Sequence, residues 1–148
     1  MISKSVNGAG ARRKGLDFER DVAKLLHSWT GLQVDRILGQ ERDGGYDLRL
    51  DPFAIQCKRV KDRKGLSVKA WWLEIYGQAW KDGLFPCLCY KVDRGPVQFM
   101  LPLTAVAGIP NDGNLPQIHH TIVIECETFK HVLLTKLSTP IGMYPNEL

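Results

Sequence analysis

Residues 44–59 read GGYDLRLDPFAIQCKR and decide the fold. Apolar and polar residues alternate over 46–50 and again over 53–58, which is the period of strands with one buried face. An Asp-Pro pair lies between the two runs and is typical of a turn. We therefore predict a β-hairpin whose register places Leu50 opposite Phe53.

This hairpin brings three polar side chains together on one face. In the predicted register Asp47 lies opposite Gln56, and directly opposed residues have Cβ atoms about 5 Å apart. A carboxylate and an amide oxygen suit a hard cation such as Mg²⁺, to which the carbonyl of Cys57 could add another oxygen. Lys58 points to the same place, so the face predicts metal-assisted attack of water on a phosphodiester. The alternative is an Asp–Lys salt bridge on an exposed sheet face.

A helix is predicted over residues 15–29, ahead of the hairpin. Its apolar residues recur at helical spacing: Phe18, Val22, Leu25, Leu26 and Trp29. At about 100° per residue, Glu19 falls inside this apolar sector. A carboxylate buried there needs a partner, because burying it alone is costly. That partner is either a metal, or a water bound to one, or an arginine.

These residues together resemble the motifs of the PD-(D/E)XK nuclease superfamily. The likeness consists of Glu19 on a preceding helix, the glycine-rich lead 44–47 that ends in Asp47, and the signature run 56–58. Gln occupies the place of the Glu that many members carry. Within the superfamily, the chain resembles phage and archaeal Holliday junction resolvases and Mrr-like restriction endonucleases, which commonly carry that Gln. The likeness spans about residues 12–101.

The resemblance implies an α/β restriction-endonuclease-like sandwich with a mixed central sheet flanked by helices. It implies that Asp47 and Gln56 bind Mg²⁺, with Mn²⁺ as an alternative ion, and that Glu19 binds a second ion or positions the water. Lys58 would stabilise the charge of the transition state or steer the nucleophile. The implied function is a DNA endonuclease that resolves four-way junctions as a homodimer. The alternatives are an Mrr-like restriction or repair nuclease and a non-catalytic DNA-binding module on a nuclease scaffold.

Basic residues gather in two blocks, one before the first helix and one after the signature strand, although the net charge is only +4. Such blocks beside a metal site favour a polyanionic partner, and solvated loops are the alternative. The predicted DNA-binding residues are Arg12, Arg13, Lys14, Arg42, Arg59, Lys61, Arg63 and Lys64.

Length and composition predict one domain. The chain has 148 residues, of which 44% are hydrophobic. We expect a flexible basic arm at 1–13, a nuclease domain at 14–137 and a tail at 138–148. There is no apolar run of membrane-spanning length and no hydrophobic signal core at the start, so we expect a cytoplasmic protein with no membrane contact, in a host bacterium if a phage encodes it.

The rest of the chain supplies the sheet and its second helix. Further elements are predicted at 33–38, 68–82, 85–90, 97–101, 121–125 and 128–136, with Ser67 capping and Gly83 ending the second helix. Gln78 on that helix could reach the active site. Its three tryptophans cannot all face one core, so one packs elsewhere, stacks on a base or fills a dimer interface. The four cysteines are read as reduced, mostly buried side chains.

Overall fold

The structure is a computed structural model. It describes residues 2–37, 45–106 and 119–138, and for residues 2–9, 11 and 138 it describes the backbone only. The elements are, in chain order, α1 (Ile2–Thr30), β1 (Asp35–Arg36), β2 (Leu48–Leu50), β3 (Phe53–Val60), the short 3₁₀ helix η2 (Arg63–Gly65), α2 (Val68–Lys81), β4 (Phe85–Val92), β5 (Gln98–Pro102), the 3₁₀ helix η3 (Leu103–Ala105), β6 (Thr121–Glu125) and α3 (Cys126–Ser138).

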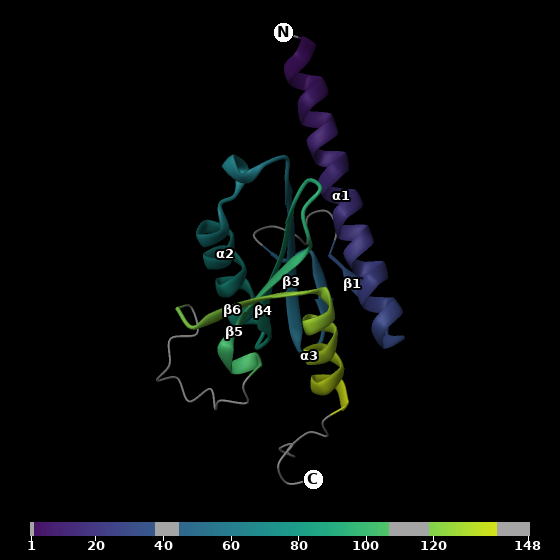
Figure 1. Ribbon diagram of the computed structural model, residues 1–148, viewed down its shortest axis with the longest axis vertical. Coiled ribbons are helices and arrows are strands. Elements are labelled where there is room, and N and C mark those ends of the chain that lie inside the picture. Colours follow the sequence, from purple (N-terminus) through teal and green to yellow (C-terminus); the bar gives the residue numbers. More distant parts are fainter. Residues whose placement is uncertain (1, 38–44, 107–118, 139–148) are drawn as a thin grey trace.

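The described strands form one mixed sheet in the order β1-β2-β3-β4-β5-β6. β3 and β4 are parallel and joined by α2, while the other neighbours are antiparallel. Leu50 pairs with Phe53 and Leu48 with Ile55, so the predicted hairpin register is confirmed. This mixed sheet with helices on both faces is the predicted α/β sandwich (Figure 1).

Each face of the sheet has its own core. On one face α1 and α3 pack over side chains such as Phe53 and Phe99, and Phe129 of α3 stacks on Phe99 with ring centroids 4.1 Å apart. On the other face Trp72 and Ile75 of α2 pack against β3 and β4. Burying one such large side chain stabilises the fold by roughly 1.5–3 kcal/mol. The two cores therefore hold the sheet rigidly between its helices.

The first helix is longer than its predicted range of residues 15–29. α1 begins at Ile2, so the backbone of residues 2–13, where the sequence predicted a flexible basic arm, is helical. Gly8 and Gly10 suggested weak helical propensity, but the alanines, arginines and lysine that follow favour a helix. The division into arm, domain and tail stays a prediction.

The second helix and the strands that follow it agree closely with their predicted ranges, whereas the strand predicted at 33–38 is only the two residues of β1. Gly83 follows α2 with a φ of +67°, as expected of a helix-ending glycine. Ser67 occupies the N-cap position, but its side chain makes no capping hydrogen bond, so that part of the prediction was wrong. Its ψ of 50° departs from the extended backbone that a capping side chain needs. Among the described residues, no helix is both long and apolar enough to cross a membrane.

Candidate active site

Asp47 lies at the tip of β2 and is held on both sides by the neighbouring strands. Its carbonyl accepts from Ile37 NH at 2.9 Å, and its own NH donates to Ile55 carbonyl at 3.0 Å. Its Oδ2 accepts from the NH of Cys57 at 2.8 Å. The side chain is buried. The carboxylate therefore lies against the peptide that joins Gln56 to Cys57, close to its predicted position opposite Gln56.

The side-chain amide oxygen of Gln56 is buried, and no hydrogen-bond donor reaches it from the described residues. Its side chain lies in the middle of β3 and is 4% exposed. Among the described residues, no group donates a hydrogen bond to its Oε1. A buried amide oxygen without a donor is costly, so it calls for a water or a cation. This is the observation that most favours a metal site beside Asp47.

Glu19 is buried on α1 and faces an arginine from the sheet. Its Oε2 lies 3.7 Å from Arg36 Nη2, and its side chain is 5% exposed against 26% for the arginine. Arg36 pairs with Leu48 in the β1–β2 ladder, which brings Glu19 beside the strand that leads to Asp47. An arginine therefore accompanies the buried Glu19, as the arginine alternative expected. The role of Glu19 toward a metal stays a prediction.

Lys58 follows on β3, two residues beyond Gln56, and is half-buried. Within the part of the chain that the structure describes, its amine forms no ion pair, so the exposed-salt-bridge alternative with Asp47 is not what the structure has. The predicted contact of Lys58 with a phosphate oxygen stays a prediction. The carbonyl of Cys57 as a ligand stays a prediction.

The residues present fit a hard cation held by few protein groups. Across residues 2–37, 45–106 and 119–138, no three His, Cys, Asp or Glu side chains gather as a metal site. The predicted set is different, since it combines the carboxylate of Asp47 with the amide oxygen of Gln56. Mg²⁺ keeps several waters and takes one or two carboxylates, so such a sparse set is compatible with it.

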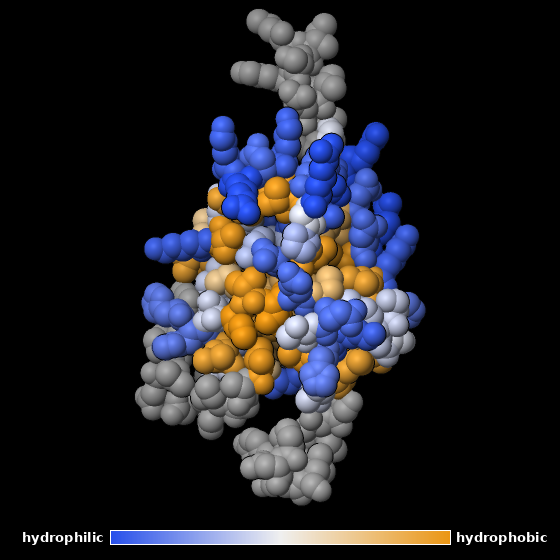
Figure 2. Space-filling model, viewed as in Figure 1, coloured by the Kyte–Doolittle hydropathy of each residue, from blue (hydrophilic) through white to orange (hydrophobic). Residues whose placement is uncertain are grey.

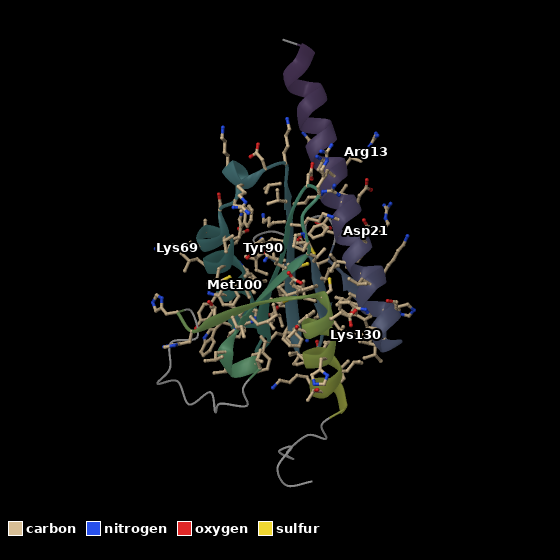
Figure 3. The ribbon with its side chains drawn as sticks, in the orientation of Figure 1. Arg13, Asp21, Lys69, Tyr90, Met100 and Lys130 are labelled. Carbon is tan, nitrogen blue, oxygen red and sulfur yellow. The ribbon has the colours of Figure 1, made fainter. Side chains whose placement is uncertain are left out.

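The predicted DNA-binding residues divide into exposed and paired ones. Five are exposed at one end of the molecule: Arg12, Arg13, Lys61, Arg63 and Lys64. Figure 2 shows hydrophilic side chains gathered at this end, where β3 ends and Arg13, labelled in Figure 3, projects from α1. Arg42 lies outside the described residues.

Lys14 and Arg59 are joined by an acid that sequence reasoning missed. Asp93, in the turn between β4 and β5, accepts from Lys14 Nζ at 2.7 Å and from Arg59 Nε at 2.8 Å. These two cations, Lys14 foremost, lower the pKa of Asp93 to about 2. The ion pairs of Asp93 with Lys14 and Arg59 join α1 to the ends of β3 and β4. They therefore help to position the helix that carries Glu19.

Gln78 lies on the side of α2 that faces the hairpin. It is half-buried, one helical turn before Asp82. Asp82 Oδ2 accepts from the hydroxyl of Tyr46 at 2.6 Å, so this side of α2 touches the strand leading to Asp47. The placement suits the predicted role of Gln78, which remains a prediction.

The buried thiols have no sign of catalytic activation. Cys57, Cys87 and Cys89 are buried free thiols, as predicted, and Cys126 is partly buried. Burial raises the pKa of Cys87 and of Cys89 well above the usual thiol range. A thiol kept protonated in this way is a poor nucleophile. These cysteines therefore serve as small apolar side chains of the core.

Comparison with known proteins identifies the class and then the family. The six-stranded mixed sheet flanked by helices is consistent with a restriction-endonuclease-like fold. A family model described as "Phage putative PDDEXK endonuclease" matches residues 10–141, so the chain belongs to that family of PD-(D/E)XK nucleases. Searches among curated proteins and among solved structures gave no match. Nucleases of this class act on DNA and generally depend on a divalent metal.

Two residues near the site were not among the predicted ones. Arg36 lay within a predicted strand, and the burial of Glu19 gave a signal that some arginine would meet it, without saying which. Asp93 is 79 residues from Lys14 in the sequence. No local pattern could have joined those two, because their contact depends on how α1 crosses the sheet.

Proposed function

We propose that the protein is a metal-dependent DNA endonuclease that cuts phosphodiester bonds at four-way junctions, as a Holliday junction resolvase does. The single observation that carries the proposal is the buried pair on adjoining strands. Asp47 is fixed by the NH of Cys57, and Gln56 beside it presents an amide oxygen without a donor among the described residues. Membership of a PDDEXK endonuclease family supports the same reading.

In the proposed site, Asp47 and Gln56 hold Mg²⁺, or Mn²⁺ in its place, with help from the carbonyl of Cys57. The bound cation would activate a water and offset charge on the phosphate oxygens. Glu19 binds a second ion or positions the water, and it exchanges its contact with Arg36 for this task. Lys58 donates to the phosphate oxygen on which negative charge grows in the transition state.

The proposed substrate preference follows from the distribution of charge. The exposed basic residues lie on α1 and after β3, at one end of the sheet, and their partners would be backbone phosphates. Phosphate contacts position a protein but carry no sequence information, so shape must supply the selectivity. A homodimer with two sites at a fixed spacing would select branched DNA and make two symmetric cuts.

The experiment compares a synthetic four-way junction with linear duplexes of the same sequences, in Mg²⁺ and at one salt concentration. Paired symmetric nicks in the junction, with the linear duplex spared, would support a resolvase. Equal cutting of both substrates, or cutting at one sequence in linear DNA, would favour an Mrr-like restriction or repair nuclease. Binding without cutting in either Mg²⁺ or Mn²⁺ would favour a non-catalytic DNA-binding module.

A further inference from the structure

Helix α2 covers only part of its face of the sheet. It packs against β3 and β4, where Leu88 is fully buried beneath it. The same row of side chains continues outward, since Leu88 pairs with Met100 on β5 and Met100 with Val123 on β6. Met100 is partly buried and Val123 is 44% exposed. The apolar row therefore runs out from beneath α2 onto an open surface.

One flank of α2 adds aromatic side chains to this surface. Asp82 bonds to Tyr46, so its side of the helix faces β2. Trp80 stands about 200° away around the helix, at 100° per residue, and so faces the β5–β6 side. Leu73 and Tyr76 lie on the same flank, because residues three and four apart are neighbours on a helix.

Two of these side chains are exposed, and Tyr76 is partly buried. Trp80 is 60% exposed and Leu73 46% exposed. The rings of Tyr76 and Trp80 stack with centroids 6.3 Å apart and planes 16° apart. Figure 2 shows hydrophobic side chains in the middle of the face on which Figure 1 draws β5 and β6. Exposed apolar side chains that adjoin one another in this way favour an interaction site.

We propose that a second copy of this chain covers this surface, which is formed by Leu73, Tyr76, Trp80, Met100 and Val123 and is called here the α2–β6 surface. In the proposed contact, α2 of each copy lies over the open β5–β6 half of the other copy's sheet. A two-fold axis parallel to the strands produces this arrangement, and the contact is isologous. Tryptophan and tyrosine at its centre are the residues that dominate such interfaces.

Charge complementarity supports a second copy as the occupant. β6 runs in the same direction as β3, so Glu125 at its end lies at the same end of the sheet as Lys69, in the first turn of α2. Both side chains are exposed, and Lys69 projects outward in Figure 3. The two-fold axis keeps this end of both copies together. It therefore places Lys69 of each copy next to Glu125 of the other, where opposite charges fix the register.

The same axis has a consequence for the proposed cleavage. Lys58 and the exposed basic residues lie toward the end of β3, and the axis turns this end of both copies the same way. Two active sites would then face one DNA molecule side by side. This consequence rests on the proposed function, whereas the contact itself does not, and it can be measured without DNA or metal.

The first test measures the molar mass of the full chain by sedimentation equilibrium over a range of concentrations. The wild type is expected to be a dimer. Trp80→Glu and Val123→Lys should each yield a folded monomer, with folding checked by circular dichroism. The matched control is Leu32→Glu, whose side chain is 44% exposed on the loop after α1 and should leave the dimer intact.

A charge exchange tests the register. The two-fold axis produces this ion pair twice, so Lys69→Glu or Glu125→Lys alone should weaken the dimer by about fivefold, on the scale of two exposed ion pairs. The double exchange should restore the wild-type dissociation constant. A monomeric wild type, or a dimer broken by Leu32→Glu but not by Trp80→Glu, would overturn the proposal. So would a double exchange that weakens the dimer further. If the wild type is a monomer and Trp80→Glu abolishes its DNA binding, the α2–β6 surface binds nucleobases instead of a second copy.

Discussion

The Oδ2 atom of Asp47 accepts a 2.8 Å hydrogen bond from the backbone NH of Cys57. This bond fixes the carboxylate at the peptide that follows Gln56, so the two predicted ligands are held by adjoining strands of one sheet. Positions held by strands are more precise than positions held by loops, which suits a site that must keep its geometry before the substrate arrives.

Gln56→Glu tests whether the amide is a working ligand. The change places a second carboxylate beside Asp47, so it should lower thermal stability in the absence of metal, because like charges are buried together. Mg²⁺ should restore the stability, and cleavage should persist at a lower Mg²⁺ concentration. Thermal unfolding and cleavage are both measured against Mg²⁺, with Gln33→Glu, on the exposed loop after α1, as the control. If the wild type cuts no DNA and Gln56→Glu cuts it, the non-catalytic DNA-binding module on a nuclease scaffold would be favoured.

Lys58→Ala should act on the rate more than on affinity. Losing one preorganised donor costs roughly 10²-fold in the rate of the chemical step. DNA affinity should change little, because the exposed basic residues still hold the backbone. Single-turnover rates at saturating enzyme separate the two effects. Lys61→Ala, an exposed neighbour on the same segment, is the matched control and should weaken binding only. An affinity loss with an unchanged rate for Lys58→Ala would refute the assigned role.

Glu19 and Arg36 should be energetically coupled. A double-mutant cycle with Glu19→Gln and Arg36→Met, measured by urea unfolding, should give a coupling energy of about 1–2 kcal/mol for this partly buried pair. Added Mg²⁺ should reduce the coupling, since a cation competes with the guanidinium for the same carboxylate. A coupling near zero would mean that the 3.7 Å contact contributes nothing. If Mg²⁺ leaves the coupling energy unchanged, Glu19 does not bind the metal.

Asp93 should contribute stability in a defined pH range. Its pKa in the folded protein is lowered to about 2, chiefly by Lys14 and then by Arg59, so the folded state binds the proton more weakly than the unfolded chain does. Its contribution is present above the ordinary carboxyl pKa, near 4, and is lost as the pH falls toward 2. Asp93→Asn should therefore lower stability at pH 7 and approach the wild type in acid.

Urea unfolding at several pH values checks this expectation. The control is Asp17→Asn, whose side chain is half exposed and lies 3.8 Å from Arg20, a contact too open to shift stability much. An Asp93→Asn deficit of equal size at all pH values would contradict an ionic role for Asp93.

The features that sequence reasoning predicted well are local ones. The hairpin register follows from two alternating runs around one turn, and the burial of Phe18, Val22 and Leu26 follows from helical spacing. The early start of α1 was missed because its glycines obscured helix formers that follow them. The ion pairs that Glu19, Lys14 and Arg59 form depend on how elements distant in the sequence pack together. The spacing of apolar residues carries no information about that packing.

The most direct test of the central claim is cleavage of a labelled four-way junction under single-turnover conditions by the wild type and by Asp47→Asn. Asparagine can still accept the hydrogen bond from Cys57, so the fold should survive while the negative ligand is lost. Asp51→Asn, at the exposed hairpin turn, is the control. We predict Mg²⁺-dependent cutting by the wild type and the control, and none by Asp47→Asn, with DNA binding retained or tighter. Full cutting by Asp47→Asn, or cutting by the wild type that persists in excess chelator, would contradict the account.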